Sequence, residues 1–201
     1  MRLSAQDLVC RRGGREVFTG VDFSLADGEA LIVTGRNGSG KSSLLRLIAG
    51  LLRPAAGRIV LEGGDPELTL SEQAHYLGHQ DPLKAALTVR ENLQFWSDYL
   101  GPAGAGREAA LAAAGLANLA DVPAAYLSTG QRRRLSLARL VSIGRPIWLL
   151  DEPTAALDSA GQARLAELMR GHLAQGGLII AAAHGAIGLS DAKQLSLGEA
   201  A

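Results

Sequence analysis

Short apolar runs alternate with longer amphipathic stretches along this chain of 201 residues. In the first part of the chain, several apolar or alternating runs have the length and β-branched content of strands, and turns such as Gly13-Gly14 separate them. These runs are Leu3–Val9, Val21–Leu25, Ala30–Thr34 and Arg58–Leu61. The pattern therefore predicts that β structure dominates residues 1 to about 80.

The pattern becomes helical at Thr88. Thr88 and Glu91 have the spacing of a capping box, in which each side chain bonds the backbone of the other residue at a helix start. The apolar residues that follow at helical spacing are Leu93, Trp96 and Leu100. A second helix is predicted over Arg107–Ala113, after the Gly-rich loop 101–106.

From Pro146 onward, strand and helix patterns alternate again. Ile147–Leu150 and Leu178–Ala183 are continuous apolar runs, which are typical of strands buried on both faces of a parallel sheet. We expect one domain over residues 1–201, with an α/β core built on a parallel sheet. An antiparallel β subdomain would form its N-terminal part, and a helical subdomain, approximately 85–140, would be inserted in it.

Composition narrows the classes of partner. Hydrophobic residues make up 47% of the chain, which is ample for a core, and Lys+Arg and Asp+Glu number 20 each. The formal net charge is therefore zero, and the overall electrostatic potential does not favour nucleic acid or an anionic membrane as a partner. The basic cluster Arg132–Arg134 is expected to be a solvated helix face. Cys10 is the single cysteine and cannot form an internal disulfide, which fits a reducing compartment.

Membrane insertion is not expected from the apolar runs. None approaches the roughly 18 residues that a spanning helix needs. The N-terminal residues lack the apolar segment of a signal peptide, so we expect a cytoplasmic chain with no direct membrane span.

Residues 35–42 fit the phosphate-binding pattern GxxxxGK[ST], between a predicted strand and a predicted helix. The candidate nucleotide-binding residues are Gly35, Arg36, Asn37, Gly38, Ser39, Gly40, Lys41, Ser42 and Ser43. Lys41 would reach the outer phosphates of a bound nucleotide, and the Ser42 hydroxyl would be a Mg²⁺ ligand. The alternative is a Gly-rich turn that opens an ordinary amphipathic helix.

The apolar run Ile147–Leu150 ends in two acids, Asp151 and Glu152. Adjacent carboxylates at the end of a buried strand are expected where one binds a cation and the other polarises a water. Asp151 would hold the Mg²⁺ shell, and Glu152 would polarise the attacking water. The alternative is a strand that runs into a solvated acidic turn.

A second candidate anion site precedes the long helical pattern 132–140. Ser128 and Gly130 stand at the start of that helix, where backbone N–H groups favour an anion. One phosphate loop does not need two such ends, so we infer that two copies face each other, each nucleotide lying between one phosphate loop and the other copy's Ser128 and Gly130. An ordinary Ser-capped helix is the alternative.

Taken in order, these motifs resemble those of the ATP-binding cassette (ABC) family over essentially the whole chain. The corresponding segments are Gly35–Ser42 (Walker A), Gln80 (Q-loop), Leu127–Gln131 (signature), Leu149–Glu152 (Walker B), Ala156–Asp158 (D-loop) and His184 (switch histidine). The resemblance implies a P-loop NTPase fold, hydrolysis of ATP coupled to transport, Mg²⁺, a homodimer and integral membrane permease subunits. It also implies that Gln80 contacts Mg²⁺ and water and couples to the permease, that Asp158 crosses the dimer interface, and that His184 contacts the γ-phosphate.

Two positions depart from the family pattern. Thr129 replaces a glycine of the usual LSGGQ signature, while Ser128 and Gly130 remain. The aromatic residue that normally stacks on adenine should lie near Arg12, where none is present. The Arg12 guanidinium could stack on the base in its place, or Arg12 could be a solvated arginine.

A narrower resemblance rests on Tyr76–Leu93, the signature helix and the short chain. These features look like the ATPase subunits of bacterial cytochrome c maturation systems, which are associated with haem export. We expect a peripheral protein on the cytoplasmic face of the inner membrane, with no nucleic-acid partner. The alternatives are the ATPase of another small-molecule exporter, that of a soluble machine such as one for iron-sulfur cluster assembly, and, last, a DNA-tethering ATPase.

Overall fold

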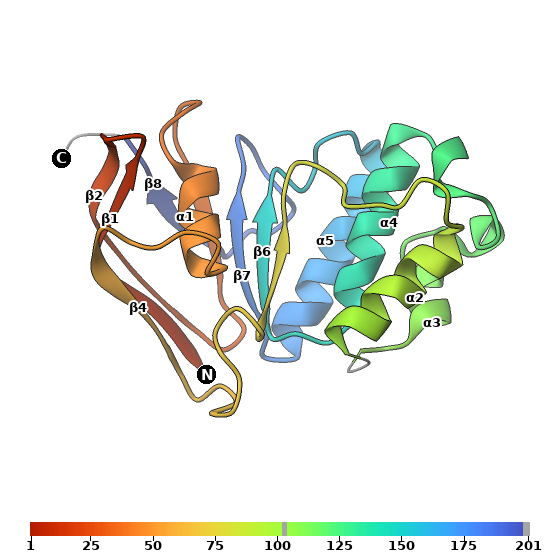
Figure 1. Ribbon diagram of the computed structural model, residues 1–201, viewed down its shortest axis with the longest axis horizontal. Coiled ribbons are helices and arrows are strands. Elements are labelled where there is room, and N and C mark those ends of the chain that lie inside the picture. The colour runs from red at the N-terminus through yellow and green to blue at the C-terminus, as the bar shows by residue number, and fades with distance from the viewer. Residues whose placement is uncertain (102–103, 199–201) are drawn as a thin grey trace. The chain divides into compact units, whose positions relative to one another are not determined.

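The computed structural model describes residues 1–101 and 104–198 (Figure 1). The chain forms two compact units. The core unit comprises residues 1–78, 146–153 and 172–201, and the helical unit comprises residues 79–145 and 154–171. Part of the predicted loop 101–106 lies outside the described residues.

The N-terminal part of the core unit is an antiparallel sheet, as predicted. Its strands are β1 (Arg2–Arg12), β2 (Arg15–Ala26) and β4 (Ala56–Glu62), in the order β2-β1-β4. Buried and exposed positions alternate along much of β1, because successive side chains of a strand point to opposite faces. The apolar face of this sheet supplies Leu3 and Leu8 to the core.

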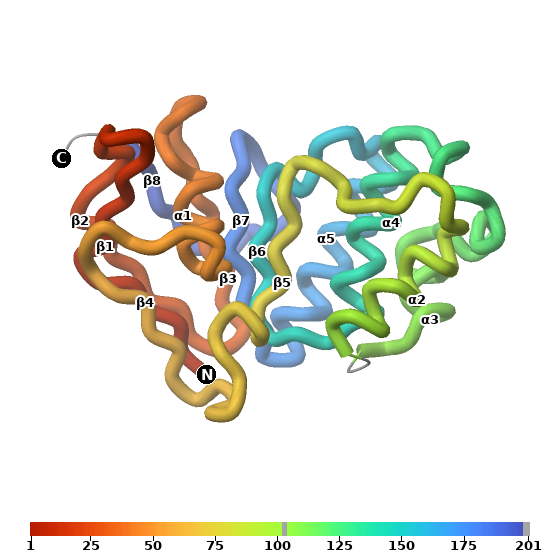
Figure 2. The backbone as a smooth tube through the Cα atoms, viewed as in Figure 1, coloured from red at the N-terminus to blue at the C-terminus, as the bar shows by residue number. Residues whose placement is uncertain are grey.

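The second sheet of the core unit is parallel, which confirms the predicted fold class. Its order is β5-β6-β7-β3-β8 (Figure 2). The strands are β5 (Ala74–Leu77), β6 (Ile147–Asp151), β7 (Leu178–Ala182), β3 (Ala30–Thr34) and β8 (Lys193–Ser196). Every residue of β6 and β7 is buried, as expected for central parallel strands. In such sheets the carboxyl ends of the strands form the edge where ligands bind.

Helix α1 (Lys41–Ile48) joins the two sheets of the core unit. Leu44, Leu45 and Ile48 are fully buried in one cluster with residues of both sheets. This packing fixes the start of α1, and with it the loop that follows β3.

The helical unit is built from α2, α3, α4 and most of α5. Their bounds are Val89–Leu100, Arg107–Ala113, Thr129–Ser142 and Ser159–Ala174, and short 3-10 turns cover Ala117–Leu119 and Ala124–Tyr126. The predicted capping box at the start of α2 is confirmed, since Thr88 accepts from the Glu91 backbone and Glu91 accepts from the Thr88 backbone. Leu93, Leu111 and Leu135 form the centre of this unit's own apolar core.

The prediction of a solvated face at Arg132–Arg134 is wrong for Arg133. This side chain is buried in the helical unit, and its guanidinium pairs with Asp81 at 3.2 Å. Consecutive helical residues point about 100° apart, so a run of three cannot share one face. Arg132 is exposed, whereas Arg134 is half-buried and donates to the Gly115 carbonyl at 3.3 Å.

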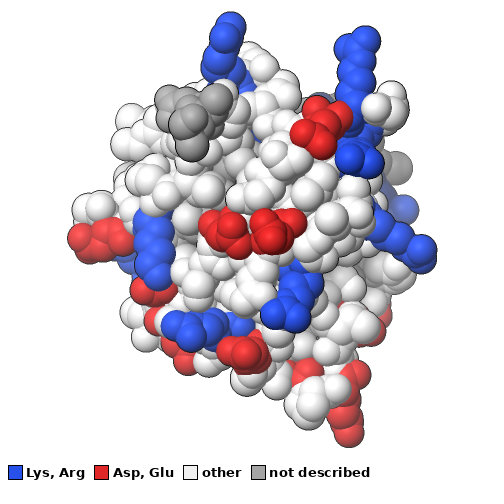
Figure 3. All heavy atoms as spheres, turned by 90° about the vertical axis from the view of Figure 1, so that its left-hand side faces the viewer, with Lys and Arg blue, Asp and Glu red and all other residues white. Residues whose placement is uncertain are grey.

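Acidic and basic side chains are interspersed on the face that Figure 3 shows.

Among residues 1–101 and 104–198, none of the helices combines the length and apolar character needed to cross a membrane.

Candidate functional site

The phosphate-loop pattern lies where the sequence predicted it, between β3 and α1. Gly40 is the N-cap of α1 and offers no side-chain bond to the first turn of the helix. The orphan N–H groups of that turn therefore point toward the loop, which is the arrangement that binds phosphate in other proteins.

Gly35 opens this loop in a conformation that only glycine adopts readily, with φ 138°. An added β-carbon there would collide with the Leu197 carbonyl oxygen and lie 2.6 Å from Ser39 Oγ. The segment after β8 thus packs directly beneath the loop, a contact that the sequence did not reveal. Leu197 N also donates to the Thr34 carbonyl at 2.9 Å, which extends the β3–β8 ladder to the loop.

Lys41 is buried at the start of α1. Its Nζ donates to the carbonyl oxygens of Gly35 and Arg36, at 2.8 and 3.3 Å. The ammonium group is therefore held over the loop. Ser43 is also buried in the first turn of α1, and its hydroxyl donates a hydrogen bond to the Cys10 sulfur.

Ser42 and Asp151 meet although they are far apart in sequence. Ser42 Oγ donates to Asp151 Oδ1 at 3.0 Å, and Asp151 is buried at the end of β6. Mg²⁺ prefers oxygen ligands and is usually held by one or two carboxylates together with substrate phosphates. A hydroxyl and a carboxylate beside a phosphate loop fit that preference. Among the described residues, no group of three or more His, Cys, Asp or Glu side chains could hold a metal without such phosphates.

Glu152 and His184 also come together in the core unit. His184 Nε2 lies 3.4 Å from Glu152 Oε1, and both side chains are partly exposed. Glu152 has φ 48°, which is unusual for a residue with a β-carbon, and its N–H donates to the Ala182 carbonyl at 2.9 Å. A non-glycine residue in this conformation costs on the order of 1 kcal/mol or more and is found most often at functional positions.

The predicted Q-loop and signature residues belong to the helical unit. Gln80 is exposed. Ser128 is the N-cap of α4: its Oγ accepts from Gln131 N at 3.2 Å, and its N–H donates to Gln131 Oε1 at 2.8 Å. The Ser128 hydroxyl proton is not consumed by that box and can be donated to an anion.

Gly130 packs closely on the D-loop turn. A β-carbon at Gly130 would lie 3.0 Å from the carbonyl oxygen of Ala156, whose φ is 64°. Asp158 caps α5 and accepts from Gly161 N at 2.8 Å. Thr129 is exposed, so the departure from the usual signature falls at a position with room for a side chain.

Arg12 ends β1 and pairs with Arg15 across the β1–β2 hairpin. Its side chain is exposed. Both sequence interpretations, a stacking guanidinium and a solvated one, are compatible with this position.

Tyr76 and Arg46 were not anticipated as site residues. Tyr76 Oη accepts from Arg46 Nε at 3.2 Å and donates to Asp151 Oδ2 at 3.4 Å. Burial, the largest influence, raises the pKa of Tyr76, so the phenol stays protonated at neutral pH. A parallel β5–β6 pairing drawn from the sequence would have placed Tyr76 beside the end of β6.

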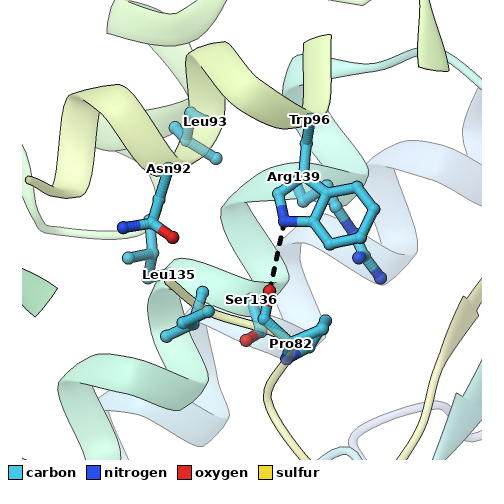
Figure 4. Close-up of a pocket in the computed structure, with 8 residues that line it drawn as sticks. Pro82, Asn92, Leu93, Trp96, Leu135, Ser136 and Arg139 are labelled. Carbon is cyan, nitrogen blue, oxygen red and sulfur yellow. Dashed lines mark hydrogen bonds between the residues drawn. The ribbon is translucent and has the colours of Figure 1, made fainter. Parts of the chain in front are cut away.

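Trp96 is half-buried against its neighbours in the helical unit (Figure 4). Its Nε1 donates to the Pro82 carbonyl at 3.3 Å, and the Arg139 guanidinium carbon lies 4.5 Å from the ring centroid. Burial lowers the pKa of Arg139 to about 10. Phe95 and Tyr99 are exposed on the same helix and stack with their centroids 6.4 Å apart.

A parallel sheet with a phosphate loop at its carboxyl edge, a serine–aspartate pair and an adjacent glutamate define a P-loop ATPase. The chain matches the ABC transporter family over residues 18–155, more than half its length. It belongs to that family and is an ATP-binding ABC-type ATPase.

Named relatives extend over the full chain. A "Cytochrome c biogenesis ATP-binding export protein CcmA" of Nitrobacter winogradskyi is 62% identical over 201 residues, 100% of both chains. A protein of the same name from Bradyrhizobium diazoefficiens is 62% identical over 98% of both chains. A solved bacterial Atm1-family ABC exporter with ATP bound is similar in structure, with TM-score 0.82 and 27% identity; the match covers 98% of this chain and 36% of that one.

Proposed function

We propose that this chain is the ATP-hydrolysing subunit of a membrane export complex that serves cytochrome c maturation, with haem as the expected cargo. The observation that carries the proposal is the 62% identity over the complete lengths of this chain and of the N. winogradskyi protein, whose name gives both cytochrome c biogenesis and export. The site supports it, because the serine–aspartate and histidine–glutamate pairs have the side chains suited to hold Mg²⁺ and to orient a water beside the phosphate loop.

Hydrolysis would use residues of the core unit. Lys41 would exchange the loop carbonyls for the outer phosphates of ATP, while Ser42 and Asp151 would hold Mg²⁺. When bound, Mg²⁺ neutralises charge that develops on the β- and γ-phosphates. Glu152 would orient the attacking water and accept its proton, and His184 would hold Glu152 and contact the γ-phosphate.

A second copy would complete each nucleotide site. Ser128 and Gly130 of one copy would face the phosphates held by the loop of the other, and closure of the dimer would be the mechanical step. Gln80 would contact Mg²⁺ and the water and link the site to the permease. Residues 1–201 would form one ATP-binding domain, peripheral on the cytoplasmic face of the inner membrane, without nucleic acid.

The test is capture from detergent-solubilised membranes together with complementation. A tagged chain should bring down integral membrane subunits, with any b-type haem visible in the absorption spectrum. In a strain that lacks this chain, wild type but not Glu152→Gln should restore haem-stained c-type cytochromes. Normal c-type cytochromes in the deletion strain would refute the proposal. Capture of soluble partners alone would favour an assembly machine, and capture of a permease without a cytochrome defect would favour another exporter.

A further inference from the structure

Tyr76 stands beside the strand that ends in Asp151. In the parallel β5–β6 register, Tyr76 pairs with Leu149. Side chains two residues apart on a strand share a face, so Tyr76, Leu149 and Asp151 lie on the same face of the sheet. The phenol ring therefore points along the sheet toward the carboxylate.

Helix α1 reaches both oxygens of that carboxylate. Ser42 and Arg46 are four residues apart on α1 and thus lie on one side of it. Ser42 Oγ donates directly to Asp151 Oδ1 at 3.0 Å. Arg46 Nε donates to Tyr76 Oη at 3.2 Å, and Tyr76 Oη donates to Asp151 Oδ2 at 3.4 Å.

We propose that Tyr76 is a positioning residue for the Mg²⁺ site, because its hydroxyl fixes the plane of the Asp151 carboxylate while Arg46 polarises that hydroxyl. The inference rests on the proposed function and adds to it residues that lie outside the six ABC motifs named above. Mg²⁺ demands near-ideal octahedral geometry, so a carboxylate that rotates is a poorer ligand. Groups that orient a metal's ligands typically contribute about 10–100-fold to metal affinity.

The hydrogen-bond network also predicts how the effects of substituting Tyr76 and Arg46 on metal affinity combine. Donation from Arg46 makes the Tyr76 hydroxyl a stronger donor, because hydrogen bonds in a chain polarise one another. The hydrogen bonds seen among the described residues connect Arg46 to Asp151 through the Tyr76 hydroxyl. Replacing Arg46 should therefore matter when the Tyr76 hydroxyl is present and have no further effect when it is absent.

The experiment compares Tyr76→Phe, Arg46→Met and the double variant, with full-length protein. Metal affinity is measured without turnover, by Mn²⁺ electron paramagnetic resonance and by Mg²⁺ titration of the protein with a fluorescent ADP analogue. Nucleotide affinity in excess EDTA and the thermal unfolding midpoint report the loop and the fold. Tyr126→Phe is the matched control, since it removes a phenol oxygen from a side chain that is 80% exposed.

Tyr76→Phe is expected to weaken Mn²⁺ and Mg²⁺ affinity by about tenfold or more. Nucleotide affinity in EDTA should be unchanged, and kcat should largely recover at saturating Mg²⁺. Arg46→Met should give a smaller loss in the same direction, and the double variant should match Tyr76→Phe. Should Tyr76→Phe not fold, Arg46→Met still tests the network, because it leaves the ring in place.

Unchanged metal affinity in Tyr76→Phe would overturn the proposal. So would an equal loss of nucleotide affinity in EDTA, which would indicate a purely structural role, or additive losses in the double variant. Failure of the proposed function is distinguishable, because it would appear as normal c-type cytochromes in the strain that lacks this chain, whereas the metal-binding measurement uses the purified protein and needs no turnover.

Discussion

His184 Nε2 and Glu152 Oε1 lie 3.4 Å apart, and the two residues follow neighbouring strands of the parallel sheet. Glu152 comes directly after β6, and His184 follows the end of β7. The Glu152 N–H bond to Ala182 ties the first turn after β6 to the last residue of β7. The backbone thus holds the Glu152 carboxylate beside the His184 imidazole. A water bound to Glu152 would therefore occupy one defined position.

Glu152→Gln is expected to lower ATP hydrolysis by about 10²–10⁴-fold, because an amide cannot accept the proton of the attacking water. ATP binding should persist, and ATP should then trap a dimer. Turnover is measured by phosphate release and the dimer by size-exclusion chromatography with ATP. Glu167→Gln, on the exposed side of α5, is the control and should behave as wild type. Wild-type turnover in Glu152→Gln would contradict the assigned role.

Arg12 tests whether a guanidinium replaces the usual aromatic contact to adenine. Arg12→Ala should weaken ATP binding by up to about 1 kcal/mol, the scale of an exposed cation–π contact, and Arg12→Tyr should restore it. Fluorescence titration with an ATP analogue measures both variants. Arg11→Ala, at the neighbouring exposed position, controls for loss of charge. Equal affinities throughout would identify Arg12 as a solvated arginine.

The segment from Gln80 to Trp96 is predicted to dock on the permease. Lys84 and Phe95 are exposed there, with Lys84 Nζ 4.3 Å from the ring centroid of Phe95, whereas Leu83 packs against the core of the helical unit. Lys84→Glu with Phe95→Ser should therefore release the protein from membranes without loss of ATP binding. Release is measured by membrane fractionation and cytochrome c maturation by haem staining.

Tyr126→Ser is the control for the docking variant, because it removes an aromatic ring from another exposed position of the same unit. It should leave membrane association unchanged. If the Lys84 and Phe95 double variant still fractionates with membranes and matures cytochromes normally, the docking surface lies elsewhere.

His172 predicts a pH dependence of stability. It stacks on Trp148 with ring centroids 4.0 Å apart, and burial lowers its pKa to about 4. An unfolded histidine titrates near 6.5, so below that pH the unfolded chain takes up a proton that the folded chain refuses. The contribution of neutral His172 is thus fully present above about pH 6.5 and is lost as the pH falls toward 4, on the order of 3 kcal/mol in all.

Urea unfolding between pH 7.5 and about 4.5 measures this slope. His172→Phe keeps a ring against Trp148 but removes the titration, so its stability should fall less steeply with acid than that of wild type. Parallel slopes for His172→Phe and wild type would show that other groups dominate.

Local chemistry made much of the fold predictable. The phosphate loop, the Thr88–Glu91 box and the apolar strands depend on residues close in sequence, and their patterns were sufficient. β8 (Lys193–Ser196) was missed because its residues are mostly exposed and carry no apolar run. The Tyr76–Asp151 and Gly35–Leu197 contacts were missed because they depend on strand order, which periodicity does not encode.

The close packing of Leu197 beneath Gly35 limits how far the chain can be shortened without disturbing the nucleotide site. A truncation that removes Leu197 would take away the carbonyl on which the phosphate loop rests and the N–H that caps the Thr34 carbonyl. A loss of nucleotide affinity in a chain shortened before Leu197 would therefore reflect the lost support and not the residues of the phosphate loop itself.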